Sequence, residues 1–401
     1  MQSFEEILKP FESKINQKIK EQKKFKSKKG FYVYELEADT TIPSEYILLM
    51  HFLGEINYEI EEKIKNYLLK KQNKDGGWPL FFDGDSDISA SVKAYFALKL
   101  AGLDEKNVAM KLAKKFIHKE GGAENVNVFT RISLALFGQV SWKSIPFMPI
   151  EIINFPMWFP FNIYKISYWS RTVLVPLLII MHRKPAANNP QNISISELFK
   201  KEQFISKVKP TKKDCFKSKF FVYLDKFARL TFPIFFLKNY KESCVEKSYS
   251  WILERLNHED GLGGIFPAMV NALICLSIDQ KSRFKNQIKV CRKAIDNLLV
   301  IKNKEAYCQP CLSPIWDTGW MGHVLLENNN NVDDIAQWFL HKEIKIKGDW
   351  CINKNIKPGG WAFQFNNEYY PDVDDTALIG MFLHRYNKNK KNIKIGNCLE
   401  R

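Results

Sequence analysis

A helix that ends in two glycines and a tryptophan recurs along this chain, and this recurrence limits the possible folds more than any other feature. The clearest case is residues 68–78 (LLKKQNKDGGW), with weaker ones at residues 251–264 and 338–361. Glycine permits the positive φ of a helix C-cap, glutamine can bond free backbone groups, and an indole ring can stack across the turn. Three comparable turns predict an array of helical repeats.

The segments between these turns have helical rather than strand periodicity. Amphipathic patterns cover residues 60–71, 89–101 and 108–118, separated by Gly, Pro and Asn, whereas alternating strand patterns are scarce. The 401 residues, of which 45% are hydrophobic, exclude wholesale disorder and suggest two or three domains. We therefore predict an all-α fold.

Neither membrane crossing nor export is expected from the sequence. The longest apolar run, residues 173–181, is far shorter than the roughly 20 residues of a spanning helix. Residues 1–24 mix acids with lysines and lack the features of a signal peptide. The eight cysteines are therefore expected to stay reduced, and a structural turn is favoured over metal or redox use for the CxxC of Cys308 and Cys311.

The net charge of +16 is concentrated near the N-terminus, where eight lysines lie in residues 14–29. Two interpretations are a solvated helix face followed by a loose arm, and a surface that binds anionic lipid. Nucleic acid is not expected as a partner, because no zinc-finger, helix-turn-helix or RNA-recognition pattern is present.

Two aromatic segments leave a choice between burial and lipid contact. Residues 145–160 (IPFMPIEIINFPMWFP) are too apolar for a solvated loop, so they are either buried between helices or face lipid. Residues 220–240 place eight aromatic side chains among Lys226, Arg229 and Lys238. This second segment is either a buried core helix or an amphipathic helix in the membrane interface.

The richest chemistry lies in residues 359–377, where Asp372, Asp374 and Asp375 follow an aromatic loop. Carboxylates this close do not all ionise easily, so at least one pKa is expected to rise, which creates a proton donor. One alternative is that Asp374 or Asp375 caps a helix over residues 376–386. Another is a Mg²⁺ or Ca²⁺ site, which needs further carboxylates that the sequence does not identify.

Four ordered motifs resemble signatures of the squalene-hopene cyclases, the bacterial class II triterpene cyclases. They are QNKDGGWPLF, ISYWSRTVLVPLL, CQPCLSPIWDTGW and PGGWAFQFNNEYYPDVDDTA, and the resemblance runs from residue 42 to residue 384. It implies α/α barrels of the terpene cyclase type, with one barrel inserted into another. The inserted barrel would span residues 37–309, whereas residues 1–36 would pack on the catalytic barrel, whose first part is residues 310–401.

The resemblance also implies that the catalytic barrel is incomplete within these residues. The family continues well beyond the DxDD motif, and residues 1–36 with 310–401 alone should not close a barrel. We therefore expect an N-terminal portion of a cyclase or one half of a split cyclase, with a separate C-terminal half as partner. The alternative is a truncated, non-catalytic membrane-associated helical-repeat relic.

Site residues follow from the same motifs. Asp374 would be the acid that protonates squalene, Asp372 and Asp375 would hold its proton, and Asp317 would lie beside it. Trp316 and Phe363 would stabilise carbocations with their aromatic faces. The remaining implied positions are Trp169, Ile265 and Gln364, which would line the pocket, and Glu45, which would join a polar network.

The implied reaction is the redox-neutral cyclisation of squalene, or a related linear polyprenyl, to hopene or hopanol. It requires neither a cofactor nor a metal. The family resemblance places the protein as a monotopic protein on the cytoplasmic side of a bacterial membrane, commonly as a homodimer.

Overall fold

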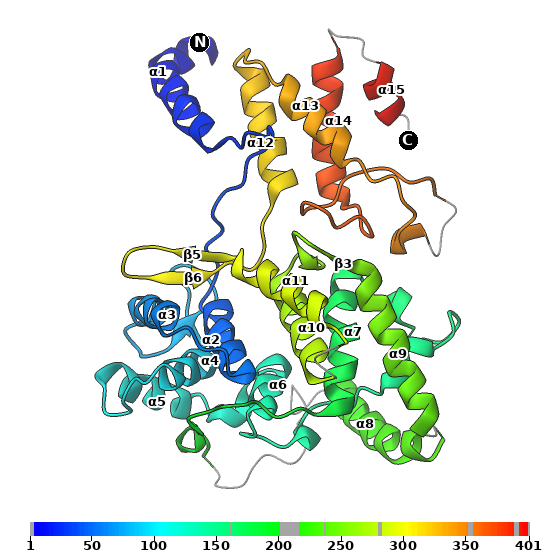
Figure 1. The fold of residues 1–401 in the computed structure, drawn as a ribbon. Helices are drawn as coiled ribbons and strands as arrows, with labels where there is room; N and C mark the ends of the chain where they lie inside the picture. Colours follow the sequence, from blue (N-terminus) through cyan, green and yellow to red (C-terminus); the bar gives the residue numbers. More distant parts are fainter. Residues whose placement is uncertain are drawn as a thin grey trace. The chain divides into compact units, whose positions relative to one another are not determined.

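The computed structural model describes residues 4–160, 162–200, 216–235, 238–279, 283–351, 356–388 and 393–399 (Figure 1). Helices dominate these residues, and the strands among them form three short antiparallel pairs. The expected all-α class is therefore confirmed. The chain divides into two compact units, Leu36–Pro310 and Met1–Glu35 with Cys311–Arg401.

The larger unit contains most of the helices. They are α2 (Thr41–Leu53), α3 (Tyr58–Lys70), α4 (Ile88–Leu100), α5 (Val108–Lys119), α6 (Val128–Leu136), α7 (Tyr168–Arg183), α8 (Phe216–Phe235), α9 (Lys238–Arg255), α10 (Phe266–Ile278) and α11 (Lys285–Asp296). Its strand pairs are β1 (Trp78–Pro79) with β2 (Ser86–Asp87), β3 (Leu256–Asn257) with β4 (Gly261–Leu262), and β5 (Leu299–Ile301) with β6 (Ala306–Cys308). The three helices expected from periodicity match α3, α4 and α5 to within two residues.

An inner set of helices in this unit surrounds a cavity of about 370 Å³. Residues of α2, α4, α6, α7 and α10 line it, whereas those of α3, α5, α9 and α11 do not. The sequence explains this difference, because a helix that is apolar all round is buried and an amphipathic one covers the outside. Eleven of the 13 residues of α4 are buried, whereas α5 buries one face through Met110, Ala113, Phe116 and Ile117. This is the inner-and-outer arrangement of an α/α barrel.

The Gly-Gly-Trp turn after α3 shows why this motif recurs. The fully buried Trp78 donates its indole N–H to the carbonyl of Leu68 at 2.7 Å, in the last turn of α3. The Gln72 amide donates to the carbonyls of Gly76 and Ala109, as expected for this side chain. Positive φ occurs at Gly76 (93°). The expectation of a glycine C-cap is wrong, because the C-cap of α3 is Lys71 with φ −90°.

The smaller unit is built from α1 (Phe4–Gln22), α12 (Pro314–Glu327), α13 (Asp333–Lys342), α14 (Val373–Asn387) and α15 (Ile393–Leu399). Two glycines let α12 approach α14 closely. A Cβ built at Gly319 would lie 2.6 Å from the Leu378 side chain, and one at Gly322 would lie 2.8 Å from the ring of Phe382. The two contacts advance in the same direction along both helices, so α12 and α14 run parallel with their first turns side by side.

The segment after α1 is fixed against α12. Thr318 Oγ1 accepts a hydrogen bond from the backbone N–H of Tyr32 at 2.9 Å, and Lys26 pairs with Asp334. Lys14, Lys18 and Lys20 are exposed on α1, as both a solvated helix face and a lipid-binding surface require, so the choice between these two stays a prediction. The loose arm predicted after it is wrong, since hydrogen bonds and an ion pair hold this segment.

Candidate active site

The three carboxylates of the DxDD block lie at the start of α14. Asp372 is the N-cap, and its Oδ1 accepts the backbone N–H of Asp374 at 2.9 Å and that of Asp375 at 3.4 Å. Its own N–H donates to the carbonyl of Trp361 at 2.7 Å. The capping role expected of Asp374 or Asp375 therefore belongs to Asp372. The helix begins at Val373, three residues earlier than predicted, because Asp372 satisfies its first N–H groups.

The same arrangement occurs at the turn between α3 and α4, in a different sequence. There Trp78 pairs with Asp87, and Asp87 accepts the N–H of Ala90 at 2.9 Å as the N-cap of α4. In both turns a hydroxyl four residues beyond the cap accepts the N–H of the tryptophan: Ser91 for Trp78 at 2.9 Å, and Thr376 for Trp361 at 3.0 Å.

Aligning the two turns separates the structural carboxylate from the added ones. Asp372 corresponds to Asp87 and Thr376 to Ser91, so both belong to the repeat. Asp374 and Asp375 stand where the turn before α4 has Ser89 and Ala90. The carboxylates that the repeat does not require are therefore Asp374 and Asp375.

We predict that Asp372→Ala and Asp87→Ala each lower the free energy of unfolding by about 1 kcal/mol, because each removes an N-cap. Asp372→Asn and Asp87→Asn are expected to restore most of the loss, since asparagine caps equally well. Urea unfolding of the four variants measures this. An Asp372→Asn variant as unstable as Asp372→Ala would show that Asp372 acts through its charge rather than as a cap.

Asp375 is the buried member of the block, with only 1% of its surface exposed. Its Oδ1 has no hydrogen-bond partner among the described residues. Burial first, and then the charges of Asp372, Asp374 and Asp317, raise the pKa of Asp375 to about 8. Asp375 therefore carries a proton at neutral pH. The side chain of Asp374, in contrast to that of Asp375, is exposed.

Asp317 lies in the first turn of α12, close enough to affect Asp375. Its Oδ2 accepts the backbone N–H of Tyr34 at 2.9 Å and the hydroxyl of Ser313 at 3.2 Å. Burial raises the pKa of Asp317, although both hydrogen bonds oppose the rise. The packing of α12 on α14 thus brings Asp317 into the same electrostatic environment as the DxDD block.

Both aromatic residues expected to stabilise carbocations belong to the smaller unit. Trp316 is half-buried next to Asp317 on α12, and Phe363 is half-buried two residues after Trp361. Sequence reasoning missed Trp320, which meets Trp316 edge to face at 5.8 Å and is 51% exposed. The spacing of four residues on one helix was the available signal, since it places the two rings on the same face.

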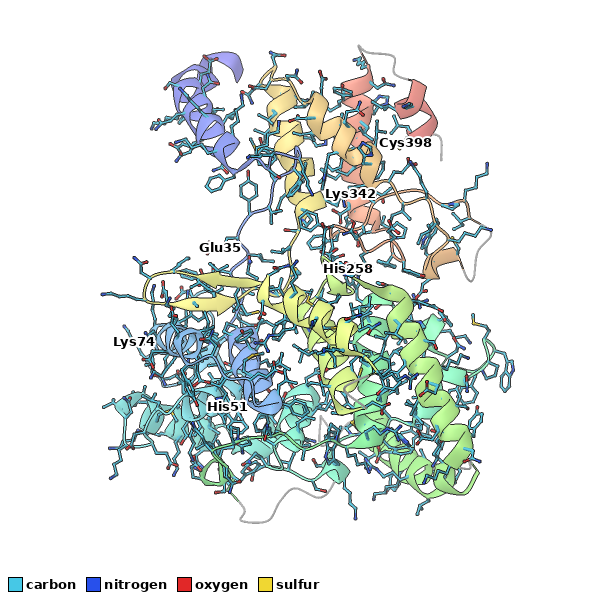
Figure 2. The ribbon with its side chains drawn as sticks, viewed as in Figure 1. Glu35, His51, Lys74, His258, Lys342 and Cys398 are labelled. Carbon is cyan, nitrogen blue, oxygen red and sulfur yellow. The ribbon has the colours of Figure 1, made fainter. Side chains whose placement is uncertain are left out.

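Gln364 lies in a separate small cavity of about 60 Å³, whose lining includes none of the three DxDD carboxylates. It is buried, and its Oε1 accepts a hydrogen bond from Asn367 at 3.2 Å. Lys342, at the end of α13 (Figure 2), borders this cavity and donates to Asn366 at 3.0 Å.

The other predicted site residues belong to the larger unit. Glu45 lines the 370 Å³ cavity and pairs with Lys93 at 2.5 Å. Trp169 and Ile265 are half-buried and do not line that cavity. They begin α7 and precede α10, two helices whose first turns meet where Gly263 packs against Thr172.

Comparison with known proteins accounts for this combination of repeats and acid block. Residues 15–304 match the Squalene-hopene cyclase N-terminal domain, and residues 312–401 match the Squalene-hopene cyclase C-terminal domain. The chain belongs to the squalene-hopene cyclase family. The resemblance stated from the four motifs is thereby confirmed.

Individual relatives agree with this family. The chain is 45% identical over 373 residues to a squalene-hopene cyclase of Bradyrhizobium diazoefficiens, and 44% identical over 376 residues to one of Schizosaccharomyces japonicus. It is 32% identical over 358 residues to that of Alicyclobacillus acidocaldarius. These matches cover 87–90% of this chain but only 56–57% of the relatives. This chain thus spans little more than half the length of the relatives that it matches.

Helix α8 of this cyclase-family chain carries an exposed aromatic face. Phe220, Tyr223, Phe227 and Leu230 recur at helical spacing and are between 55% and 72% exposed. The part of residues 220–240 that belongs to α8 is therefore not a buried core helix, and this interpretation is wrong there. Residues 236–237 lie outside the described residues. In the described ranges, no helix has both the length and the apolarity to cross a membrane.

The prediction that segment 145–160 is buried is confirmed for only part of it, and its contact with lipid stays a prediction. Ile145, Ile150 and Ile153 are buried, whereas Met157 and Trp158 are exposed.

The CxxC cysteines are poor nucleophiles, since burial raises the pKa of Cys308 far above its usual range and that of Cys311 to about 11. Within the described residues, no group of His, Cys, Asp and Glu is arranged to hold a metal ion.

Proposed function

We propose that this chain contains the proton-donating part of a triterpene cyclase, which protonates squalene and cyclises it to a hopanoid, either hopene or hopanol. The observation that supports this most directly is the protonated, buried Asp375 beside Asp374 at the start of α14. Only a carboxylic acid that keeps its proton at neutral pH can serve as the general acid for an alkene.

In the proposed reaction Asp374 transfers its proton to the less substituted carbon of a terminal double bond of squalene. The π electrons form the new C–H bond, which leaves a tertiary carbocation on the substrate and a carboxylate on Asp374. The dipole at the start of α14 stabilises this carboxylate. Asp375, which keeps a proton next to Asp374, is proposed to hold the donor's proton in place, and Asp372 holds both residues in position by capping the helix.

Aromatic rings stabilise the cations that follow. A cation over a desolvated ring gains about 2 kcal/mol, and a ring does not quench it as a carboxylate or water would. We assign this role to Trp316 and Phe363. Trp169, Ile265 and Gln364 are proposed to line the substrate path, and Glu45, through its pair with Lys93, is proposed to form a polar end of it.

The partners follow from the same proposal. Squalene is a membrane lipid, and the exposed aromatic face of α8 supports attachment of a monotopic protein to the cytoplasmic side of a bacterial membrane. A homodimer is part of the proposal. So is a C-terminal partner, since the relatives extend well beyond the length that this chain matches. Each step is redox-neutral, so no cofactor takes part.

Incubation of the detergent-solubilised chain with squalene, followed by mass spectrometry of the products, tests this function. The chain is co-expressed with the C-terminal part of the Bradyrhizobium diazoefficiens relative, the part that follows the matched residues. We expect pentacyclic product from this combination. Product from the chain alone would show that it needs no such partner. The absence of cyclised product in both cases, from folded protein, would favour a non-catalytic role.

A further inference from the structure

A second cavity of the larger unit, of about 120 Å³, lies where the end of α7 meets α8, α9 and the segment before α7. Both basic and apolar side chains line it. They are Trp142, Phe147, Met148, Pro149, Ile150, Glu151, Met181, His182, Lys184, Arg229 and Lys241. No residue of the proposed acid block or of the 370 Å³ cavity belongs to this set.

The packing around this cavity fixes its walls. Arg229 of α8 donates to the carbonyl of Ile145 and pairs with Asp225 at 2.6 Å. Asp225 accepts the backbone N–H of Phe147, whose ring contacts that of Phe232 at 5.8 Å between centroids. These contacts attach the segment before α7 to α8, so the cavity is a built feature of the unit.

Positive charge exceeds negative charge around the cavity. Lys184, Arg229 and Lys241 contribute cations, and the acids beside the lining are Asp225, Glu151 and Glu242. Glu242 of α9 pairs with Arg183 at 2.6 Å and lies 3.8 Å from His182. Asp225 balances Arg229. The nitrogen of Lys241 lies 3.9 Å from Glu151, beyond hydrogen-bonding distance. Lys184 makes no ion pair within the described part of the chain, and it ends α7 in a left-handed conformation with φ 51°.

Glu151 is the unusual member of this set. Only 2% of its surface is exposed, and its Oε1 has no hydrogen-bond partner among the described residues. Burial raises the pKa of Glu151, although Lys241 opposes the rise. When Glu151 is protonated, it leaves the lysines uncompensated and offers a hydrogen-bond donor to an anion.

The surroundings select the kind of anion. Trp142, Phe147 and Met148 make one wall apolar, and α8, which supplies Arg229, carries the exposed face of Phe220, Tyr223, Phe227 and Leu230. A ligand with a phosphate and an acyl chain matches both features. We propose that this cavity binds the phosphate of an anionic lipid headgroup through Lys184, Lys241 and Arg229. The lipid source rests on the membrane attachment proposed above, whereas phosphate recognition does not.

Vesicle binding of the full chain tests this inference. With vesicles of phosphatidylcholine and phosphatidylglycerol, the variant Lys184→Gln/Lys241→Gln is expected to bind about 30-fold more weakly than the wild type, which corresponds to about 2 kcal/mol. On phosphatidylcholine alone the two should bind equally. The matched control is Lys111→Gln/Lys115→Gln, which removes the same charge from exposed positions on α5. Equal weakening by both pairs, or no weakening by either, would overturn the proposal.

Two further measurements separate the sources of phosphate and the two proposals. Calorimetry with glycerol phosphate should show weak binding that Lys184→Gln/Lys241→Gln abolishes and Glu151→Gln retains; binding as tight as to vesicles would identify a free phosphate ester as the ligand. Phe227→Ser/Leu230→Ser should remove binding to phosphatidylcholine. If the wild type binds no vesicles, membrane attachment fails, and glycerol phosphate still tests the cavity by itself.

Discussion

Asp374→Asn and Asp375→Asn are each expected to slow squalene cyclisation by about 10²- to 10⁴-fold, the usual contribution of a general acid. Asparagine keeps the size and most of the polarity of the side chain but cannot donate the proton. Asp375 matters because it is the buried carboxyl that holds a proton at neutral pH, and Asp374 because it is the proposed donor. Product formation is measured by mass spectrometry in the form of the protein in which the wild type is active.

Asp372→Asn is the matched control for this prediction. It removes a carboxylate from the same block but keeps the helix cap, as the comparison with Asp87 indicates. We therefore expect a much smaller loss of rate than in the other two variants, with unchanged circular dichroism in all three. If Asp372→Asn were as inactive as Asp374→Asn, the division of the block into one structural and two chemical carboxylates would be wrong.

The helices could be predicted because their signals are local. Helical periodicity located α3, α4 and α5, although α4 is buried on nearly all its faces rather than amphipathic, and the Gly-Gly-Trp motif located the turn that fixes Trp78. The motif could not show that Trp78 and Trp361 bond the preceding helix in the same way, because Phe339 lies 22 residues before Trp361, whereas Leu68 lies ten before Trp78. Only the folded chain reveals that equivalence.

The sequence predicts which residue types form the site, but not which of its carboxylates is buried. Three adjacent carboxylates predict a raised pKa on one of them, and a raised pKa is found. Which residue is buried depends on where α14 begins, and the sequence placed that start at residue 376 rather than at Val373. The cap at Asp372 sets the helical phase and turns Asp375 towards the core and Asp374 away from it. A shift of the helical phase by one position would place Asp374 in the buried position instead.

The exposed face of α8 was ambiguous for a different reason. Aromatic residues at helical spacing describe a buried stripe and a lipid-facing stripe equally well, since both are apolar. The choice depends on which neighbouring elements cover the helix. Likewise, the basic cavity beside α8 joins residues that are up to about a hundred positions apart, so no local pattern predicts it.

The raised pKa of Asp375 also predicts how stability depends on pH. Its pKa rises from 3.8 to about 8 on folding, so between these values the folded state binds a proton that the unfolded state has released. The free energy of unfolding therefore falls as pH rises through this window, by at most about 1.4 kcal/mol per pH unit. The stabilisation is fully present below pH 4 and is lost above pH 8, a change on the order of several kcal/mol.

Urea unfolding of the wild type and Asp375→Asn at several pH values isolates this contribution, because all other titrating groups are common to both. Asparagine stays neutral, so the variant should gain stability relative to the wild type as pH rises from 4 to 8. Asp374→Asn should move the window to lower pH, since the charge of Asp374 is one cause of the raised pKa. A pH-independent difference between wild type and Asp375→Asn would mean that Asp375 ionises normally in the folded chain, and the main observation that supports the proposed function would be lost.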